Sequence, residues 1–202
     1  MSLQYLKIGF LASGSASSAR AIVAAIQAGE LAGEACLMVS NNRSAAALEF
    51  AREQGIAALC IPTKDDAAAA DARIAEVMAK HGVELIVMSG YLRHLGPQTL
   101  ERYAGRILNI HPGPLPDFGG EGMYGRRVHE AVLAAGVAES GVVIHLVDEE
   151  YDHGAPVARM AVPITPGDTV DDLEARVRET EPGFFVETLQ KLSRGELALP
   201  PA

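Results

Sequence analysis

The stretch "LKIGFLASGSASSARAIVAAIQAG", residues 6–29, starts as an apolar run of strand length, passes through a turn of small residues and continues into a helix-like segment that ends at Gly29. A buried strand, a tight turn and a helix form the repeating unit of a parallel sheet. Small residues in such a turn let backbone N–H groups approach a phosphate at the positive end of the helix. A tight turn alone explains them equally well, because both G-x-G-x-x-G and the P-loop lysine are absent.

The alternation of strand-like and helix-like segments continues outward from this unit. Apolar runs of strand length follow at "ACLMVSN", "ALCIPTK" and "ELIVMSG", and helix-like segments that end at Gly55 and Gly82 separate them. Glycine suits the left-handed cap of a helix. We therefore predict an α/β protein with a Rossmann-like, open, mostly parallel twisted sheet and helices on both faces.

The second half of the chain predicts a different ending. After the strand "RILNIH", a loop and the helix "RRVHEAVLAAG", the strands "SGVVIHLVD" and "APVARMAVPI" are joined by "EEYDHG" as a C-terminal hairpin. The last helix starts at "DTVDDLEARV", where Thr169 and Asp172 fit a capping box. A chain of 202 residues is most simply read as one domain, residues 1–202.

Charge and composition argue against several classes of partner. The formal net charge is −9 and the pI is about 5.1, with no cluster of Lys and Arg, so we expect no nucleic-acid partner. No apolar run reaches the roughly 18 residues of a membrane span, so we expect no membrane partner. Cys36 and Cys60 each lie in an apolar strand-like run, which favours buried thiols in a reducing compartment and a cytoplasmic protein.

Two polar residues end the apolar strand in "ILNIHPGPLPDF", residues 107–118. Asn109 and His111 are two residues apart, so both side chains project from the same face of a strand. Pro112 places them at the carboxyl end of that strand, the edge where open α/β sheets bind ligands. An amide and an imidazole there can hold a carbonyl oxygen that becomes negative. The alternative is that both side chains only satisfy the backbone of the proline-rich loop.

A second polar group follows in "DEEYDHG", residues 148–154. For Asp148, Glu149 and Glu150 taken singly, a solvated hairpin tip is the simpler interpretation. Asp152 differs, because a turn can direct its carboxylate back into the cleft. A carboxylate near His111 would favour the protonated ring and could relay a proton.

The segments "NIHPGPLP", "SGYLRHL" and "HLVDEEYDHG" and the small-residue loop stand in the order found in the 10-formyltetrahydrofolate-dependent formyltransferases, which the chain resembles over roughly residues 6–197. The length and the segment "GDTVDDLEARV" are most similar to the members that act on glycinamide ribonucleotide in de novo purine biosynthesis. The resemblance implies transfer of the formyl group of 10-formyltetrahydrofolate, a co-substrate, by direct attack of an amine through a tetrahedral intermediate.

The resemblance also implies roles for individual residues. Asn109 and protonated His111 would stabilise the tetrahedral oxyanion, and Asp152 would maintain the charge of the histidine and help proton movement. The residues implied for folate binding are Leu92, Arg93, His94, Leu95, Asp148, Glu149, Glu150 and Tyr151. Those implied for the amine substrate are Ser15, Ala16, Ser17, Ser18, Gly90 and Glu181. His145 resembles a family position, but we interpret it as a hydrogen-bonded core histidine. No metal is implied.

The departures from the family pattern fall on the side of the amine substrate. Where the family has Gly-Ser-Asn or Gly-Thr-Asn, this chain has Ala16, Ser17 and Ser18, and the usual Glu-His pair is Glu181-Pro182. The proline is expected to kink or interrupt the last helix. The loop over residues 119–127 is longer than the commonest version.

These departures leave more than one acceptor amine open. Another phosphorylated amine, such as a sugar nucleotide, is an alternative acceptor, whereas formylation of methionyl-tRNA and hydrolysis of the folate are disfavoured. A non-catalytic nucleotide-binding module on the same fold is the alternative from another class. The protein is expected as a monomer or a homodimer.

Overall fold

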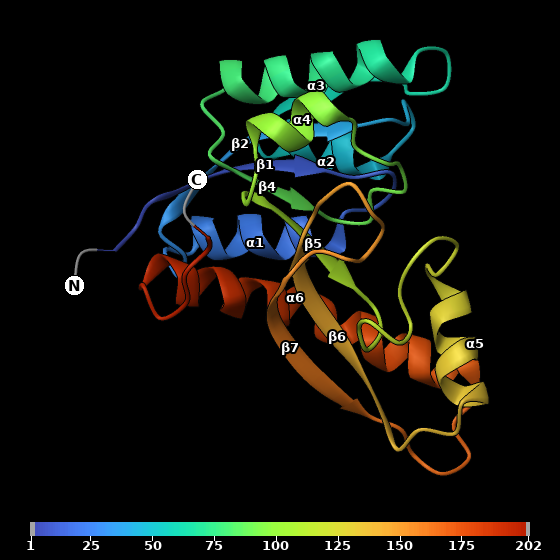
Figure 1. The fold of residues 1–202 in the computed structure, drawn as a ribbon. Helices are drawn as coiled ribbons and strands as arrows, with labels where there is room; N and C mark the ends of the chain where they lie inside the picture. The colour runs from blue at the N-terminus through green and yellow to red at the C-terminus, as the bar shows by residue number, and fades with distance from the viewer. Residues whose placement is uncertain (1–2, 201–202) are drawn as a thin grey trace.

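The computed structural model describes residues 3–200 as an open sheet with helices packed on its faces (Figure 1). Its strands are β1 Leu6–Leu11, β2 Gly33–Ser40, β3 Ala57–Cys60, β4 Leu85–Met88, β5 Ile107–His111, β6 Glu139–Leu146 and β7 Pro156–Pro163. Its helices are α1 Ser17–Gln27, α2 Ala46–Glu53, α3 Ala67–Lys80, α4 Pro97–Arg102, α5 Arg126–Ala134 and α6 Val170–Ser193. The alternating segments of the sequence thus form the predicted elements.

The seven strands lie in the order β3-β2-β1-β4-β5-β6-β7. The first five pair in parallel, and β6 pairs antiparallel with both β5 and β7. The chain order reverses between β1 and β4, where the carboxyl ends of parallel strands leave a crevice for ligands. The prediction of a mostly parallel sheet with a C-terminal hairpin is confirmed.

The burial of the strands follows from their places in the sheet. Strand β4, "LIVM", is buried at every residue because it lies between β1 and β5 and has helices on both faces. Strand β7 is the edge, and most of its residues are exposed or half-buried. It begins with Pro156 and ends with Pro163, residues that cannot donate to a ladder and are tolerated at a sheet edge.

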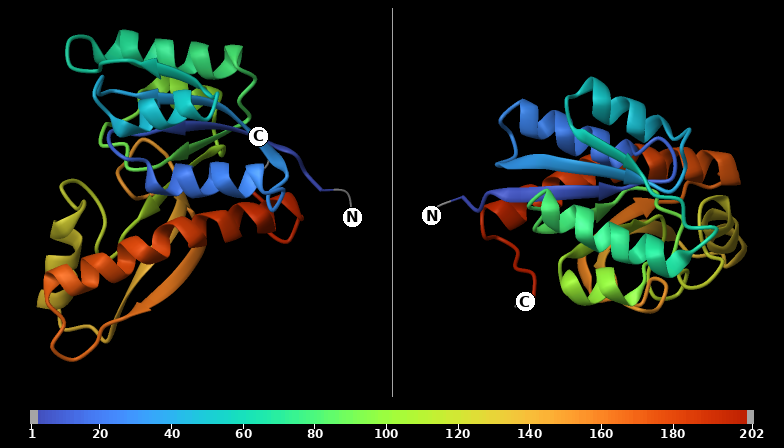
Figure 2. Two further views of the ribbon diagram at one scale, coloured as in Figure 1. Left: turned by 180° about the vertical axis from the view of Figure 1, so that it is seen from behind. Right: turned by 90° about the horizontal axis from the view of Figure 1, so that it is seen from above.

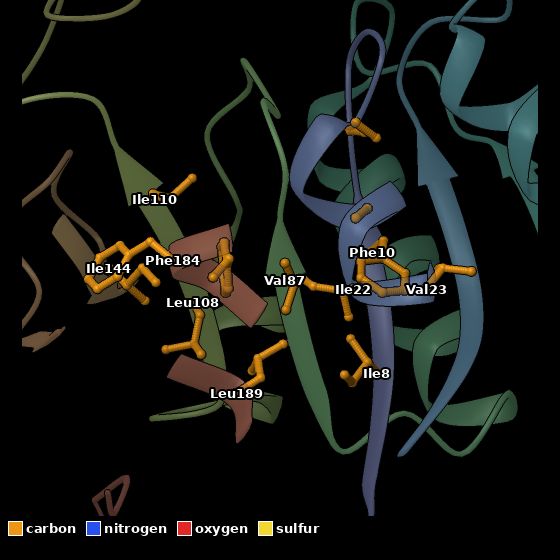
Figure 3. Close-up of a cluster of buried hydrophobic side chains, with 14 of the residues drawn as sticks. Ile8, Phe10, Ile22, Val23, Val87, Leu108, Ile110, Ile144, Phe184 and Leu189 are labelled. Carbon is orange, nitrogen blue, oxygen red and sulfur yellow. The ribbon is translucent and has the colours of Figure 1, made fainter. Parts of the chain in front are cut away.

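Two apolar cores lie on opposite faces of the sheet. The view from above in Figure 2 shows helices on both sides of the strands. One face packs against α1, α2, α5 and α6, and the other packs against α3 and α4. In the first core, Ile22 of α1 and Phe184 and Leu189 of α6 lie over strand residues such as Val87 and Leu108 (Figure 3). Helices α1 and α6 also pack against each other, so the last helix covers the first unit of the fold.

The helix ends have the geometry that the sequence predicts. Gly29, Gly55 and Gly82 have φ values of 72°, 71° and 68°, in the left-handed region where a glycine carries no steric penalty. Thr169 and Asp172 form the predicted capping box at the start of α6. These caps end each crossover cleanly and return the chain to the next strand.

Of the two outcomes expected at Pro182, a kink or an interruption, the interruption is wrong, because α6 runs from Val170 to Ser193 with the proline inside it. A proline removes one backbone hydrogen bond and crowds the preceding turn. Here Phe184, Phe185 and Leu189 follow the proline and are buried in the core. Burial of apolar side chains on both sides of Pro182 therefore offsets the lost backbone hydrogen bond and the crowding in the preceding turn.

Candidate active site

Strand β5 and the connection between β6 and β7 bring three predicted residues together. Asp152 Oδ2 lies 3.3 Å from Nδ1 of His111, and its Oδ1 lies 3.5 Å from Nε2 of His145. Asn109 Nδ2 lies 3.1 Å from the same Nε2 of His145. We call Asn109, His111, His145 and Asp152 the polar cluster. The two segments that the sequence singled out therefore meet beside β5.

The imidazole of His111 has an oxygen acceptor at each ring nitrogen. Its Nε2 lies 2.7 Å from the carbonyl oxygen of Phe118, and its Nδ1 faces Asp152. A doubly protonated ring can donate to both acceptors. The side chain is 3% exposed, so protein groups surround the ring. A substrate oxygen that accepts a hydrogen bond from Nε2 must therefore displace the carbonyl oxygen of Phe118.

Asp152 is held as a carboxylate. Burial alone would raise its pKa, but hydrogen bonds to His111 and His145, the charge of His111 and the backbone N–H of Gly120 hold that pKa well below its ordinary value. The Gly120 N–H donates to Oδ2 at 3.0 Å. Asp152 has a φ of 57°, which is unusual for a residue with a side chain. Strained backbone conformations of this kind are concentrated at functional sites.

His145 is the member of the cluster whose contacts the sequence reasoning missed. As expected it is buried, and its Nδ1 donates to the Leu146 carbonyl at 2.8 Å. Its Nε2, however, is shared between Asn109 and Asp152. A neutral ring accepts the proton of the Asn109 amide there, and a doubly protonated ring donates towards Asp152. The antiparallel register that sets Asn109 opposite His145 would have revealed this contact, and no single-strand pattern contains it.

A pocket opens directly beside the polar cluster. It is lined by Met88, Arg93, His94, Leu95, Asn109, His145, Val147, Asp148, Glu150, Tyr151 and Asp152. Six of the eight residues predicted to bind folate therefore line this pocket, and Leu92 and Glu149 do not. Leu92 is 64% exposed.

The pocket has one wall from the segment after β4, Arg93 to Leu95, and another from the segment after β6, Asp148 to Asp152. His94 joins these two walls. Its Nε2 lies 2.8 Å from the carbonyl oxygen of Glu149, and its ring stands edge-on to the ring of Tyr151 with 5.0 Å between the ring centres. Glu149 thus contributes its backbone carbonyl, although it does not line the pocket. The segments after β4 and after β6 are therefore fixed against each other.

The small-residue loop after β1 begins helix α1 in an unusual way. Ala16, the residue before the helix, has a φ of 57°, and no side chain of its own caps the helix. The N–H groups of Ser17 and Ser18 open the helix, where an α-helix has no acceptor of its own to offer them. Ser15 and Ser17 are exposed, and Ser18 is buried. The arrangement presents backbone donors at the positive end of a helix, which suits an anion.

Arg20 holds this loop from one turn further along the helix. Its Nε donates to the carbonyl of Ser15 at 2.8 Å and its Nη2 to the carbonyl of Ala46 at 3.2 Å. The guanidinium also lies over the ring of Phe50, 4.3 Å from the ring centre. The loop is thus fixed through its backbone, without the amide side chain that the family pattern usually has.

Glu181 is the remaining predicted substrate residue and lies on α6. Burial raises its pKa to about 7, against the smaller opposite effects of Arg178 and His111. Glu181 does not line the pocket described above. None of the residues predicted for the amine lines the pocket that holds most of the residues predicted for folate.

Residues 3–200 offer neither a metal-binding group nor a membrane-spanning helix. No three His, Cys, Asp or Glu side chains in this range are grouped so that they would hold a metal ion. In the same range, none of the helices combines the length and the apolar character that crossing a membrane requires.

Fold and site together define an α/β protein with an imidazole, an amide and a carboxylate clustered beside a pocket at the ligand-binding edge of its sheet. Such a cluster suits chemistry at a carbonyl group. The sequence profile of the formyl transferase family matches residues 6–189. The chain belongs to the formyl transferase family.

Relatives of known name agree with this assignment. The chain is 36% identical to the chloroplastic phosphoribosylglycinamide formyltransferase of Arabidopsis thaliana over 91% of its own length and 64% of that relative. It is 33% identical to the phosphoribosylglycinamide formyltransferase of Haemophilus influenzae, covering 96% of this chain and 90% of that one. The chain thus spans less than two thirds of the plant protein and nearly all of the bacterial one.

A solved structure has the same fold. The crystal structure of glycinamide ribonucleotide transformylase 1 from Symbiobacterium toebii matches with a TM-score of 0.88 and 32% identity, over 97% of this chain and 91% of that chain. The match includes nearly every element of the sheet, since it covers almost the whole chain.

Proposed function

We propose that this protein transfers the formyl group of 10-formyltetrahydrofolate to the amine of glycinamide ribonucleotide in de novo purine biosynthesis. The observation that carries the proposal is the polar cluster of Asn109, His111, His145 and Asp152 beside a pocket, in a chain of the formyl transferase family. The names of the relatives support the choice of acceptor. The protein is, on this proposal, a one-carbon transferase.

The pocket suits the folate co-substrate. Leucine and methionine side chains supply apolar surface for a flat heteroaromatic ring, and Tyr151 and His94 add aromatic edges. Carboxylates of Asp148 and Glu150 and backbone groups of the two walls supply hydrogen-bond partners. The reacting formyl group would lie at the end of the pocket where Asn109 and Asp152 are found.

The chemistry assigned to the cluster follows from its charges. The amine nitrogen of the acceptor attacks the formyl carbon, and the electron pair of the carbonyl moves onto its oxygen. Asn109 Nδ2–H and His111 Nε2–H donate to that oxygen, with His111 giving up the carbonyl of Phe118. The carboxylate of Asp152 lies 3.3 Å from Nδ1 of His111 and would stabilise positive charge on the ring. The proton lost by the amine passes through water to the folate nitrogen that leaves.

The acceptor is assigned to the small-residue loop and α6. The N–H groups of Ser17 and Ser18 would bind the phosphate, with Ser15, Ala16 and Gly90 shaping the loop, and Glu181 would bind the ribose hydroxyls. A different phosphorylated amine is the second candidate, favoured by the replacement of the family's Gly-Ser-Asn by Ala16-Ser17-Ser18.

A direct assay tests the proposal. The protein is mixed with 10-formyltetrahydrofolate and glycinamide ribonucleotide, and deformylation of the folate is followed. We expect turnover that depends on the amine. Absence of turnover with any phosphorylated amine would reject formyl transfer, whereas faster turnover with another amine would reject only the acceptor.

We also infer a cytoplasmic protein that forms one domain over residues 1–202 and is a monomer or a homodimer. The free thiols of Cys36 and Cys60 support a reducing compartment. Sedimentation equilibrium of the purified protein would distinguish one chain from two and would reject both if a larger mass were found.

A further inference from the structure

Ser13 leads from β1 into the small-residue loop, and its polar groups are bound to neighbouring segments. Its N–H donates to the carbonyl of Gly90 at 3.0 Å. Its hydroxyl donates to Asn41 Oδ1 at 2.6 Å and accepts the N–H of Leu92 at 2.9 Å. The one hydroxyl proton is thereby used, together with one of its lone pairs. Two of these three bonds tie the loop to the segment that follows β4.

Ser89 makes the reverse connection. It follows β4 and is 4% exposed, and its hydroxyl oxygen accepts the N–H of Ala19, in the first turn of α1, at 3.2 Å. Because Ala16 offers no side-chain cap, Ser89 supplies from the next segment a cap that the helix lacks in its own sequence. We call Ser13 and Ser89 the serine seam.

The seam lies between residues assigned to two different substrates. On one side is the small-residue loop, Ser15–Ser18, and on the other is the pocket wall formed by Arg93, His94 and Leu95. Within residues 3–200, neither serine of the seam lines that pocket. A shift of the loop relative to the wall would break the bonds of Ser13 to Gly90 and Leu92 and the bond of Ser89 to Ala19.

We propose that the serine seam couples the two substrates, so that the bound folate tightens binding of the phosphorylated amine and the reverse. The inference rests on the proposed function. A substrate that fixes one side of the seam also fixes the other, so the second substrate meets an ordered site and loses less entropy on binding. Ser13 and Ser89 are positioning residues, since neither is assigned a contact with a reacting atom.

Calorimetry of a non-reacting pair tests the coupling. Binding of glycinamide ribonucleotide is measured without and with saturating tetrahydrofolate, which has no formyl group to transfer. We expect the dissociation constant of the wild type to fall at least about fivefold with tetrahydrofolate present. In Ser13→Ala the change should be less than about twofold, and the same loss should be found when tetrahydrofolate is titrated with the amine present.

Three further variants separate coupling from loss of structure. Ser193→Ala is the matched control, because Ser193 is also a buried serine that joins distant segments, donating to the carbonyl of Gln4 at 2.8 Å near the start of β1. It should keep the wild-type ratio. Ser13→Thr retains a hydroxyl and should regain most of the coupling. Ser89→Ala should lose coupling and serves if Ser13→Ala does not fold.

The outcomes distinguish the two proposals. A wild-type protein that binds each substrate alone, with no change when both are present, overturns the seam and leaves the proposed function intact. The wild-type ratio in Ser13→Ala or Ser89→Ala also overturns the seam. A protein that binds tetrahydrofolate but no glycinamide ribonucleotide overturns the proposed acceptor, and the coupling to it as well.

Discussion

The polar cluster beside β5 and the small-residue loop after β1 are built in opposite ways. In the cluster, the side chains of His111, His145 and Asp152 fix one another, and the two histidines are almost completely buried. In the loop, Arg20 holds the backbone carbonyl of Ser15 and ties it to that of Ala46 in α2, and two of the four loop side chains face solvent. The comparison indicates that side-chain identity matters most in the cluster and that the loop tolerates change.

The largest effect should follow from removal of the imidazole in His111→Ala. Loss of an oxyanion donor and of the charge beside Asp152 should lower kcat at least about 10³-fold and leave the KM of both substrates within about threefold. Steady-state kinetics of formyl transfer would measure both constants. A wild-type kcat in this variant would contradict the conclusion that side-chain identity matters most in the polar cluster.

A smaller effect is expected at His145, which orients its neighbours in the cluster. His145→Leu leaves Asn109 Nδ2 and one oxygen of Asp152 without their partner and should lower kcat/KM about tenfold. His145→Gln keeps a polar group at this position and should recover part of the loss. An unchanged rate in the leucine variant would reduce His145 to the core residue that the sequence suggested.

Glu181 gives a prediction that depends on pH. Its pKa of about 7 in the folded protein lies above the ordinary value of 4.5, so the folded state binds the proton more tightly than the unfolded chain. The stabilisation is present below pH 4.5 and is lost as the pH rises through 7. Glu181→Gln, which cannot ionise, should therefore unfold at higher urea than the wild type at pH 8, and the difference should vanish near pH 4.

The same variant sharpens the comparison in kinetics. If the ionised carboxylate accepts hydrogen bonds from ribose hydroxyls, the KM of the amine in the wild type should fall severalfold as the pH rises through 7. Glu181→Gln should lack this dependence, because its amide does not titrate. A flat profile in the wild type would contradict the role assigned to Glu181.

The smallest effect should come from Ala16→Gly, which restores the residue usual in the family. The left-handed conformation of Ala16 costs about 1 kcal/mol, and glycine removes that strain but loses about as much through the flexibility of the unfolded chain. Thermal unfolding should shift by no more than a few degrees and the KM of the amine by less than twofold. A tenfold change would show that the loop depends on this side chain.

The sequence predicts most of the fold because local signals agree with it. Apolar runs, glycine caps at Gly29, Gly55 and Gly82 and the box of Thr169 and Asp172 each act within a few residues. The run through Pro182 was not predictable in this way, since it depends on packing of α6 against distant strands.

The candidate site was predictable to the extent that its residues stand in short motifs. The pair Asn109 and His111 needs only the period of a strand. The contacts of His145 depend on which strands are neighbours, and the bond of His111 to Phe118 depends on the path of a loop. The serine seam arises only because β1 and β4 are adjacent, although 73 residues and two other strands separate Leu11 and Leu85 in the chain.

The residues of the polar cluster are synthesised at different times, which matters for chains that are still incomplete. Asn109 and His111 leave the ribosome before the hairpin of β6 and β7, and Asp152 lies in the connection within that hairpin. A nascent chain can hold the loop after β1 and the whole parallel half of the sheet, and still lack the carboxylate on which its imidazole depends. Chains that terminate before Asp152 are therefore expected to be inactive.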